Sequence, residues 1–470
     1  MDSCDSFAQY LCFVGDVFFA ILEQNRHLGH TCMELSKFTE KAARYAFINK
    51  KDIYAYLEFY SDTILCLDNL VGFKEDYHKD LVIKERVSER LKRSSLSNIK
   101  TTTNSRLNID QKTAVKEAPK TDISIVTGGA GTGKTTIINQ ILKNFNRTYH
   151  GTKKAFVLTP TGKAARRAKE TITEECEIST VHYFAGWGHP LCRRDYQRIR
   201  SADFIIVDEV SMLSAAMFYI LIQITEAPMV LVGDINQLPA VEAGNILKDL
   251  IDIGVPAYYL NTNYRSDDDI LCNANAFLDK TGFHGLIASD NFQIQKISEE
   301  EAAEQLANTG ADIILTPYRK EDIDGSCTSI NNILHEQRGF DKGIYHVGEP
   351  VIIMNSNKKR GYVNGETGYV TAVTLEEIYV DLGDRVVAIK DDEDLDLNYA
   401  STIHKSQGSE YDTVAIYCPN TTMMTKNILY TAITRAKHRV MLFYTDDTVF
   451  EQAYQRNAYA RSTFLSTMAA

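Results

Sequence analysis

Paired cysteines are the first feature that this chain of 470 residues lacks. Its nine cysteines are scattered, and none of them belongs to a C-x-x-C pair. Zinc ribbons depend on such pairs, and small disulfide-stapled domains need cysteines at a much higher density. The sequence therefore argues against both classes and favours reduced thiols, as in a cytoplasmic protein.

A long hydrophobic run is missing as well. The most apolar stretch, residues 7–22, carries Asp16, has no basic start and is too short to cross a bilayer. We predict a core helix there and no membrane association.

Basic charge is in the minority, because 51 Lys and Arg residues stand against 62 Asp and Glu residues and the formal net charge is −11. A chain with this balance is not expected to coat nucleic acid through bulk charge, although a local basic groove is compatible with it. The apolar content of 44% is ordinary for a globular protein. The length allows about three or four domains.

Residues 123–136, ISIVTGGAGTGKTT, hold the clearest motif that is present. The pattern predicts a buried strand, then a glycine loop, then a helix. Gly128, Gly133, Lys134 and Thr135 satisfy G-x-x-x-x-G-K-[ST], in which glycines let backbone N–H groups turn towards phosphates. Lys134 would reach the β and γ phosphates of a nucleotide and Thr135 its magnesium ion, while the helix N-terminus favours the same anion. The predicted nucleotide-binding loop consists of Gly128, Gly129, Ala130, Gly131, Thr132, Gly133, Lys134, Thr135 and Thr136.

Two acids and two amides extend this prediction. Asp208 and Glu209 come directly after the apolar run FIIV, and Gln237 comes after MVLVGDIN. The carboxyl ends of parallel strands meet at one sheet edge, so these side chains are expected beside the phosphate loop. There Asp208 can hold Mg²⁺, Glu209 can deprotonate the attacking water, and Gln237 can sense the γ phosphate. Gln111 precedes the first strand, and its amide matches the hydrogen-bonding edge of adenine.

Alternation of apolar strands with helical patterns over residues 101–254 predicts a parallel sheet with helices on both faces. A second set of strand patterns, VPAYYL, DIILTP, TVAIYC and VMLFYT, predicts another α/β domain made of residues 255–339 and 398–470. Short alternating strands with turn signals over 340–397 predict a small SH3-like β-barrel inserted in that domain. The predicted fold class is therefore α/β.

Residues 1–100 show helical spacing and no catalytic constellation. We predict a helical N-terminal domain that is either an autonomous cap or a docking surface for a partner. Its last helix, VIKERVSERLKR, is predicted to expose a charged, solvated face.

Seven motifs occur in one order along the chain, namely GGAGTGKTT, LTPTGKAAR, VDEVSML, GDINQLPAVEAG, NYRS, STIHKSQGSEYD and LYTAITRAK. They resemble the motifs of superfamily 1 helicases, and more closely those of RecD, the alpha subunit of bacterial exodeoxyribonuclease V. The likeness covers nearly the whole length, and LGHTCMEL near residue 30 resembles the RecD amino-terminal region. It implies two RecA-like domains with ATP in the cleft between them.

The resemblance also assigns nucleotide contacts beyond the phosphate loop. Tyr264 resembles the ring that stacks on adenine, and Arg265 and Arg435 resemble the two arginines that reach the γ phosphate across the cleft. Guanidinium groups suit that role because they stay charged and donate through a fork. Gly408 and Glu410, in QGSEYD, resemble nucleotide-binding positions, and Glu410 that of the ribose contact.

The positions that resemble contacts to the DNA strand are Thr161, Lys163, Thr180, His182, Thr402, His404 and Lys405. Hydroxyl groups and lysines suit phosphates, which position a strand without reading its sequence. The implied binding is therefore sequence-tolerant and directed at single strands. His182 and His404 could instead ligate zinc, but no cysteine or acidic partner stands at metal spacing.

The resemblance implies an ATP- and Mg²⁺-dependent helicase that moves 5′ to 3′ on single-stranded DNA and acts on end-containing duplex DNA together with RecB- and RecC-like subunits. Two alternatives remain open, a free-standing helicase of phage or conjugation type and a non-motor DNA-stimulated ATPase or DNA-binding scaffold. Residues 184–203 leave little room for a long strand-splitting hairpin. Trp187, the only tryptophan, is therefore either a wedge or a packed hairpin residue.

Overall fold

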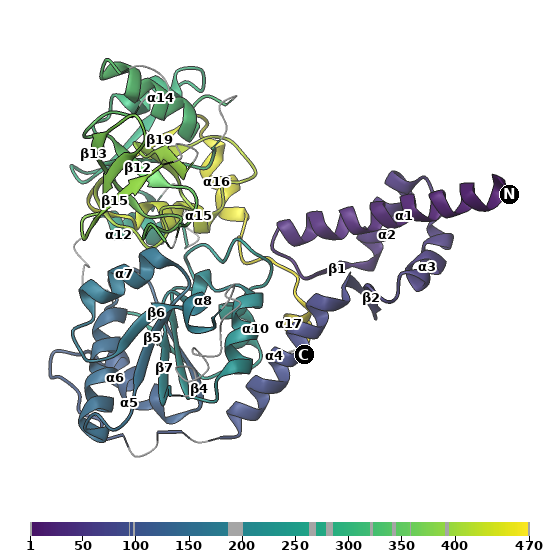
Figure 1. Cartoon of the computed structure of the whole chain (residues 1–470), viewed down its shortest axis with the longest axis horizontal. Coiled ribbons are helices and arrows are strands. Elements are labelled where there is room, and N and C mark those ends of the chain that lie inside the picture. Colours follow the sequence, from purple (N-terminus) through teal and green to yellow (C-terminus); the bar gives the residue numbers. More distant parts are fainter. Residues whose placement is uncertain are drawn as a thin grey trace.

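Two parallel sheets form two lobes of the protein, and an N-terminal region extends away from them (Figure 1). The computed structural model describes residues 2–93, 95–96, 99–186, 201–262, 269–278, 285–319, 323–340, 345–357, 359–390 and 394–468, with side chains from residue 10 onward. Trp187, Tyr264 and Arg265 lie outside the described residues. Within the described part of the chain, no helix combines the length and apolar character that a membrane span requires.

The first sheet has six strands, all parallel, as predicted from the alternating pattern. In spatial order they are β6 (Glu177–Thr180), β5 (Ala155–Thr159), β7 (Phe204–Val207), β8 (Met229–Gly233), β4 (Ile123–Gly128) and β9 (Ala257–Leu260). Its helices are α5 (Ile109–Glu117), η1 (Ala118–Lys120), α6 (Lys134–Tyr149), α7 (Gly162–Thr171), α8 (Val181–Phe184), η2 (Val210–Met212), α10 (Ala215–Ile224) and α11 (Ile246–Asp252).

Both faces of this sheet are buried. In β4, Ile123 and Ile125 belong to the core that includes residues of α10, whereas Val126 belongs to the core that includes residues of α6. Successive strand residues point to opposite faces, so a run of apolar residues is what a strand covered on both sides requires.

The strand VPAYYL corrects the predicted domain boundary at residue 254. It forms β9, which pairs with β4 in the register Ile125↔Ala257 to Gly128↔Leu260 and closes one edge of the first sheet. The apolar pattern predicts that this segment is a strand, but it does not predict which sheet the strand joins.

The second sheet has five parallel strands. In spatial order they are β10 (Phe292–Lys296), β19 (Ala436–Tyr444), β18 (Tyr411–Cys418), β11 (Ile313–Thr316) and β17 (Ala400–Thr402). The helices of this lobe are α12 (Asp269–Ala276), α13 (Ala302–Ala307), α14 (Cys327–Gln337), α15 (Lys426–Ile433) and α16 (Thr448–Gln455). The prediction of a second parallel sheet from DIILTP, TVAIYC and VMLFYT is confirmed.

An antiparallel sheet is inserted between α14 and β17 (Figure 1). Its order is β15 (Val386–Ile389), β14 (Ile378–Asp381), β13 (Thr367–Val373), β12 (Pro350–Ile353) and β16 (Leu395–Leu397), and it has its own apolar core. The predicted insertion of short strands is therefore present. Among the described residues, no pairing joins β15 to β16 to close the sheet into a barrel.

The N-terminal region is only partly helical, which corrects the prediction for residues 1–100. The helices α1 (Asp2–His27), α2 (Leu35–Ala46) and α3 (Lys50–Phe59) pack with an antiparallel sheet of β1 (Cys32–Glu34), β3 (Leu70–Phe73) and β2 (Ile64–Leu67). Leu67 pairs with Leu70 across a two-residue turn in which Asp68 has a φ of 52°. An Asp-Asn pair suits such a left-handed turn. The prediction from helical spacing did not take this turn signal into account.

The helix α4 (Lys74–Leu91) joins the N-terminal region to the first sheet, and its apolar side is not solvated. Ile83 and Val87 belong to the core on the α10 face of the sheet. Arg90, three residues after Val87, is buried as well. The predicted charged, exposed face is present in α4, where Glu85 and Glu89 are exposed, but the opposite face packs on the first lobe. The predicted boundary at residue 100 therefore separates α4 from the core to which it belongs.

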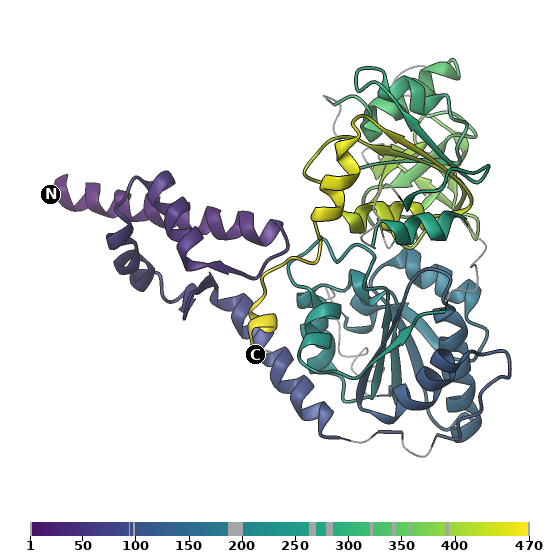
Figure 2. The same ribbon diagram turned by 180° about the vertical axis from the view of Figure 1, so that it is seen from behind.

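The C-terminal segment, residues 457–468, leaves the second lobe and returns to α4 (Figure 2). Its short helix α17 (Phe464–Thr467) packs on α4 and α11, and Leu465 joins the core of the first lobe. The assignment of this segment to the second domain is therefore also wrong.

Candidate active site

Glycines shape the loop between β4 and α6. Gly131 and Gly133 have φ values of 75° and 85°, in the left-handed region that L side chains rarely adopt. A Cβ at Gly133 would lie 2.6 Å from Nε2 of Gln111. The helix α6 begins at Lys134, directly after Gly133, so its N-terminal N–H groups open onto the loop.

The Lys134 side chain lies over this loop. Its Nζ donates to the carbonyl oxygens of Gly128 at 2.8 Å and of Gly129 at 2.9 Å. The ammonium group is thus held where β and γ phosphates would meet the loop.

A cleft of ≈ 580 Å³ opens beside the loop and draws residues from both lobes. The first lobe contributes Gln111, Ala130, Gly131, Gly133, Lys134, Thr135, Thr136, Arg167, Asp208, Glu209 and Gln237, and the second contributes Gly408, Glu410, Thr434 and Arg435. Most of the predicted nucleotide site therefore meets in one cavity.

Asp208 and Glu209 follow β7 and line the cleft. Burial, followed by the charge of Glu209, raises the pKa of the Asp208 carboxyl above its ordinary value, while the N–H of Glu209 and the charge of Lys134 oppose the shift. Glu209 has a φ of 54°, a left-handed conformation that is strained for a residue with a side chain. Its Oε2 is buried and has no hydrogen-bond partner among the described residues.

These residues fit a nucleotide and its metal. The loop supplies backbone N–H groups and an ammonium, and Thr135 and Asp208 supply the hard oxygen ligands that Mg²⁺ prefers. Within the described structure, Oε2 of Glu209 and Oε1 of Gln237 are buried without a partner, so the protein leaves acceptors for a bound group to use.

The loop that carries Gln237 ties the two lobes together. Nε2 of Gln237 lies 3.4 Å from Oδ2 of Asp234, and Asp234 is fully buried. The next residue, Leu238, donates its N–H to Oγ1 of Thr431 on α15 at 2.9 Å and accepts from Nε2 of Gln407 at 3.0 Å. The side chain of Leu238 belongs to the core of the second lobe.

Arg435 follows α15 and is buried in the cleft wall. It donates from Nε to the carbonyl of Thr431 at 2.9 Å and from a terminal nitrogen to that of Ser409 at 3.2 Å. Burial lowers its pKa, and the charge of Glu209 opposes this. The guanidinium is therefore held by hydrogen bonds within its own lobe and lines the same cleft as the acids of the first lobe. The second predicted arginine, Arg265, lies outside the described residues, as does Tyr264.

Gln111 and Glu410 both have protein partners. Gln111 donates to the carbonyl of Thr132 at 2.9 Å and completes a capping box with Asn108 at the start of α5, so it supports the loop. Glu410 forms an ion pair with Arg167 of α7 across the cleft. Sequence reasoning missed Arg167, although it lies in the helix of the LTPTGKAAR motif one turn after Lys163.

The predicted strand contacts occupy the ends of helices and strands. The hydroxyls of Thr161 and Thr180 cap α7 and α8, and that of Thr402 accepts from the N–H of Lys405 at 3.3 Å. His182 is exposed, whereas His404 is partly buried. Thr161 and Thr180 belong to the first lobe and Thr402 to the second.

The two lysines of this set have lowered pKa values. Burial and then the charge of Arg435 lower the pKa of Lys163 to about 8. Burial also lowers the pKa of Lys405. Its Nζ lies 3.3 Å from Sδ of Met354, the residue after β12 in the inserted antiparallel sheet. Burial likewise lowers the pKa of His404. In the described structure, no group of three His, Cys, Asp or Glu side chains could hold a metal ion.

Comparison with known proteins adds family information. The model of an AAA domain matches residues 111–243, and that of a UvrD-like helicase C-terminal domain matches residues 397–443. The chain is 28% identical over 390 residues to the RecBCD enzyme subunit RecD of Mycolicibacterium smegmatis, covering 70% of each protein. It is 30% identical over 370 residues to the ATP-dependent RecD2 DNA helicase of Deinococcus radiodurans, covering 73% of this chain and 49% of that protein.

A solved structure of Pif1 helicase from Bacteroides, in complex with ADP-AlF3 and single-stranded DNA, is similar with a TM-score of 0.49 at 20% identity, covering 75% of this chain and 98% of that one.

Proposed function

We propose that this chain, which is a RecD-like superfamily 1 helicase, uses ATP hydrolysis to move 5′ to 3′ along single-stranded DNA and to separate DNA strands. One observation carries the proposal. The cleft beside the phosphate loop is lined by residues from two lobes, each built on its own parallel sheet. The contacts of a nucleotide bound there would therefore depend on the relative position of the two lobes.

In the proposed reaction, Lys134 offsets the charge of the β and γ phosphates, and Arg435 stabilises the charge that develops on the γ phosphoryl group. Glu209 orients and deprotonates the attacking water, and its unpartnered Oε2 supports that role within the described site. Gln237 reports the γ phosphate to the second lobe through Leu238. Arg265, Tyr264, Gln111, Gly408 and Glu410 complete the proposed nucleotide contacts.

Magnesium would be held by Thr135 and Asp208, and it would polarise the phosphate oxygens when bound. Burial and the charge of Glu209 raise the pKa of Asp208, and a divalent ion bound at that carboxylate would favour its ionised form.

For DNA, we propose two sets of phosphate contacts that grip in turn. Thr161, Lys163, Thr180 and His182 act on the first lobe, and Thr402, His404 and Lys405 act on the second. Closing and opening the cleft would then move one set relative to the other.

We further propose that the chain is cytoplasmic and works with RecB- and RecC-like subunits on DNA ends, as the names of its RecD relatives suggest. The insertion at residues 340–397 would correspond to an SH3-like barrel. A free-standing helicase is the second candidate, favoured by the 30% identity to a protein named as a RecD2 DNA helicase. Directional movement by the purified chain without partners would favour this second candidate.

The test is displacement of streptavidin from biotin at either end of a single-stranded oligonucleotide. With ATP, release is expected to be faster from the 3′ end, and no release is expected with a non-hydrolysable analogue. Lys134→Ala is expected to lower the DNA-stimulated ATPase rate by at least about 100-fold and to stop release. Lys116→Ala, on the exposed side of α5, is the matched control. Equal release from both ends, or release without hydrolysis, would favour the non-motor ATPase instead.

A further inference from the structure

Tyr430 lies on α15, at the boundary between the two lobes, and the roles given above do not use it. Its hydroxyl accepts a hydrogen bond from the N–H of Ala130 in the phosphate loop at 3.0 Å. The same hydroxyl donates to Oδ2 of Asp234 at 3.0 Å. The side chain is almost completely buried.

These two hydrogen bonds cross from one lobe to the other. Ala130 and Asp234 follow β4 and β8 of the first sheet, whereas α15 packs in the core of the second lobe. The bonds can exist only while the lobes are together, so they stabilise the closed cleft relative to an open one.

The same helix leads to Arg435. Thr431, the residue after Tyr430, accepts from Nε of Arg435 through its carbonyl and from the N–H of Leu238 through its hydroxyl. Two neighbouring residues of α15 therefore hold the hydroxyl that accepts from the phosphate loop and the guanidinium that lines the same cleft.

The phosphate loop leaves room for this hydroxyl. A Cβ at Gly129 would lie 2.9 Å from the hydroxyl oxygen of Tyr430, closer than ordinary contact. Gly129 therefore leaves the room that the approach of the tyrosine requires.

We propose that Tyr430 is a positioning residue that links closure of the cleft to the arrangement of the phosphate loop and of Arg435. This inference rests on the proposed ATPase function. Asp234 takes part because it accepts from Tyr430 and also from the N–H of Asn236 and from Gln237, so one carboxylate connects the tyrosine to the proposed γ-phosphate sensor.

The test compares Tyr430→Phe with Tyr417→Phe in the full chain. Tyr417 lies on β18, is fully buried, and its hydroxyl has no hydrogen-bond partner among the described residues, so Tyr417→Phe breaks no hydrogen bond. Tyr430→Phe removes both hydrogen bonds of the hydroxyl. We expect it to raise the KM for ATP and to lower kcat of the DNA-stimulated ATPase, each by about five- to tenfold, because one lost hydrogen bond is worth about that factor. A partly unfolded variant would lower kcat and leave KM unchanged.

A second variant keeps the test decisive if Tyr430→Phe does not fold. Ala130→Pro removes the N–H donor and leaves the tyrosine in place. We expect the same rise in KM. Because Ala130 belongs to the predicted nucleotide-binding loop, the part of the effect that depends on the tyrosine is identified by combining the two substitutions, whose effects we expect to be less than additive. If both variants match Tyr417→Phe in KM and kcat, the inference is overturned. If the wild-type chain shows no DNA-stimulated ATPase, the proposed function itself has failed.

Discussion

At the scale of single residues, Glu209 is held against its own conformational preference. Its left-handed φ of 54° costs on the order of 1–3 kcal/mol for a residue that carries a side chain. The turn begins η2 directly after β7, and it presents two acids in succession at the end of a buried strand. Packing and hydrogen bonds in the rest of the first lobe must hold Glu209 in this conformation. The strained residue therefore lies in the cleft.

Two buried acids where the C-terminal segment meets α4 and α11 give a prediction about pH. Asp80 accepts from Oγ1 of Thr31 at 2.9 Å and from the N–H of Leu465 at 3.1 Å, and Asp249 accepts from Oγ1 of Thr463 at 2.9 Å. Burial raises the pKa of each carboxyl to about 7.

A raised pKa in the folded state means that these acids favour folding most when they are protonated. Their contribution is fully present below about pH 4, the ordinary value for Asp, and is lost as pH rises through about 7. Between pH 5.5 and pH 8 the melting temperature of the wild type should therefore fall. In Asp80→Asn/Asp249→Asn the fall should be smaller by about 2–4 °C, measured by calorimetry. Asp290→Asn, at an exposed site, should keep the full wild-type fall.

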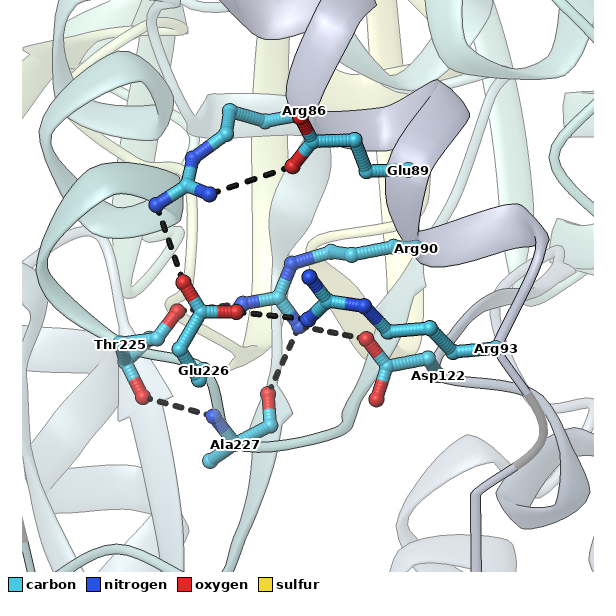
Figure 3. Close-up of polar contacts among 8 residues, drawn as sticks. All are labelled: Arg86, Glu89, Arg90, Arg93, Asp122, Thr225, Glu226 and Ala227. Atoms are coloured by element: carbon cyan, nitrogen blue, oxygen red, sulfur yellow. Dashed lines mark hydrogen bonds and ion pairs between the residues drawn. The ribbon is translucent and has the colours of Figure 1, made fainter.

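At the scale of elements, α4 is fastened to the first lobe by three arginines (Figure 3). Arg90 is buried and donates to Oδ2 of Asp122 at 3.1 Å, to the carbonyl of Ala227 at 3.0 Å and to that of Thr225. Arg86 and Arg93 flank Glu226 at 2.9 and 2.7 Å. Burial is the largest influence on both members of the central pair, lowering the pKa of Arg90 and raising that of Asp122.

Removing Arg90 should destabilise the protein far more than removing Arg93. Arg90→Ala is expected to lower the free energy of unfolding of the first lobe by about 3–5 kcal/mol, because Asp122 would remain buried without its charge partner. Arg93→Ala, which removes an exposed ion pair, should change little. Urea unfolding followed by fluorescence measures both. Equal effects of the two substitutions would contradict the assignment of Arg90 as the anchor.

At the scale of the whole molecule, the C-terminal segment connects all three parts of the chain. It leaves the second lobe, and its Ser462 carbonyl accepts from the N–H groups of Thr31 and Cys32 at 3.0 and 3.3 Å, in the N-terminal region. Arg461 donates to the carbonyls of Glu242 and Gly244 in the first lobe. The segment therefore links the second lobe by hydrogen bonds to both the N-terminal region and the first lobe.

Phe464 is the apolar anchor of this connection. It is fully buried and meets the ring of Tyr77 edge-on at 5.3 Å. Phe464→Ala is expected to cost about 3–5 kcal/mol of local stability. Hydrogen exchange should then rise in α4 and β1, while β18 and β19 keep their protection. Phe47→Ala, at a residue that is 88% exposed, is the control. Unchanged exchange in α4 would show that the segment does not hold the N-terminal region.

The sequence by itself determined the parts of this protein that depend on neighbouring residues. The phosphate loop between β4 and α6, the acids after β7 and eight of the eleven described strands of the two parallel sheets follow from spacing, glycine positions and apolar runs. The strands β6, β10 and β17 are not predicted from the sequence. Each of these signals is local, because the period of apolar residues and the need for a left-handed turn are properties of a short segment.

The tertiary structure decided which segments meet. It placed β9 at the edge of the first sheet, seated α4 and α17 on the first lobe, and brought Arg167 to Glu410 and Tyr430 to Ala130. A periodic pattern tells which side of a helix is buried but not what covers it, and an arginine on that side, such as Arg90, resembles a solvated one until its partner is known. Contacts between residues some 30 to 300 positions apart are selected by packing and by the pairing of buried polar groups, which no local pattern encodes.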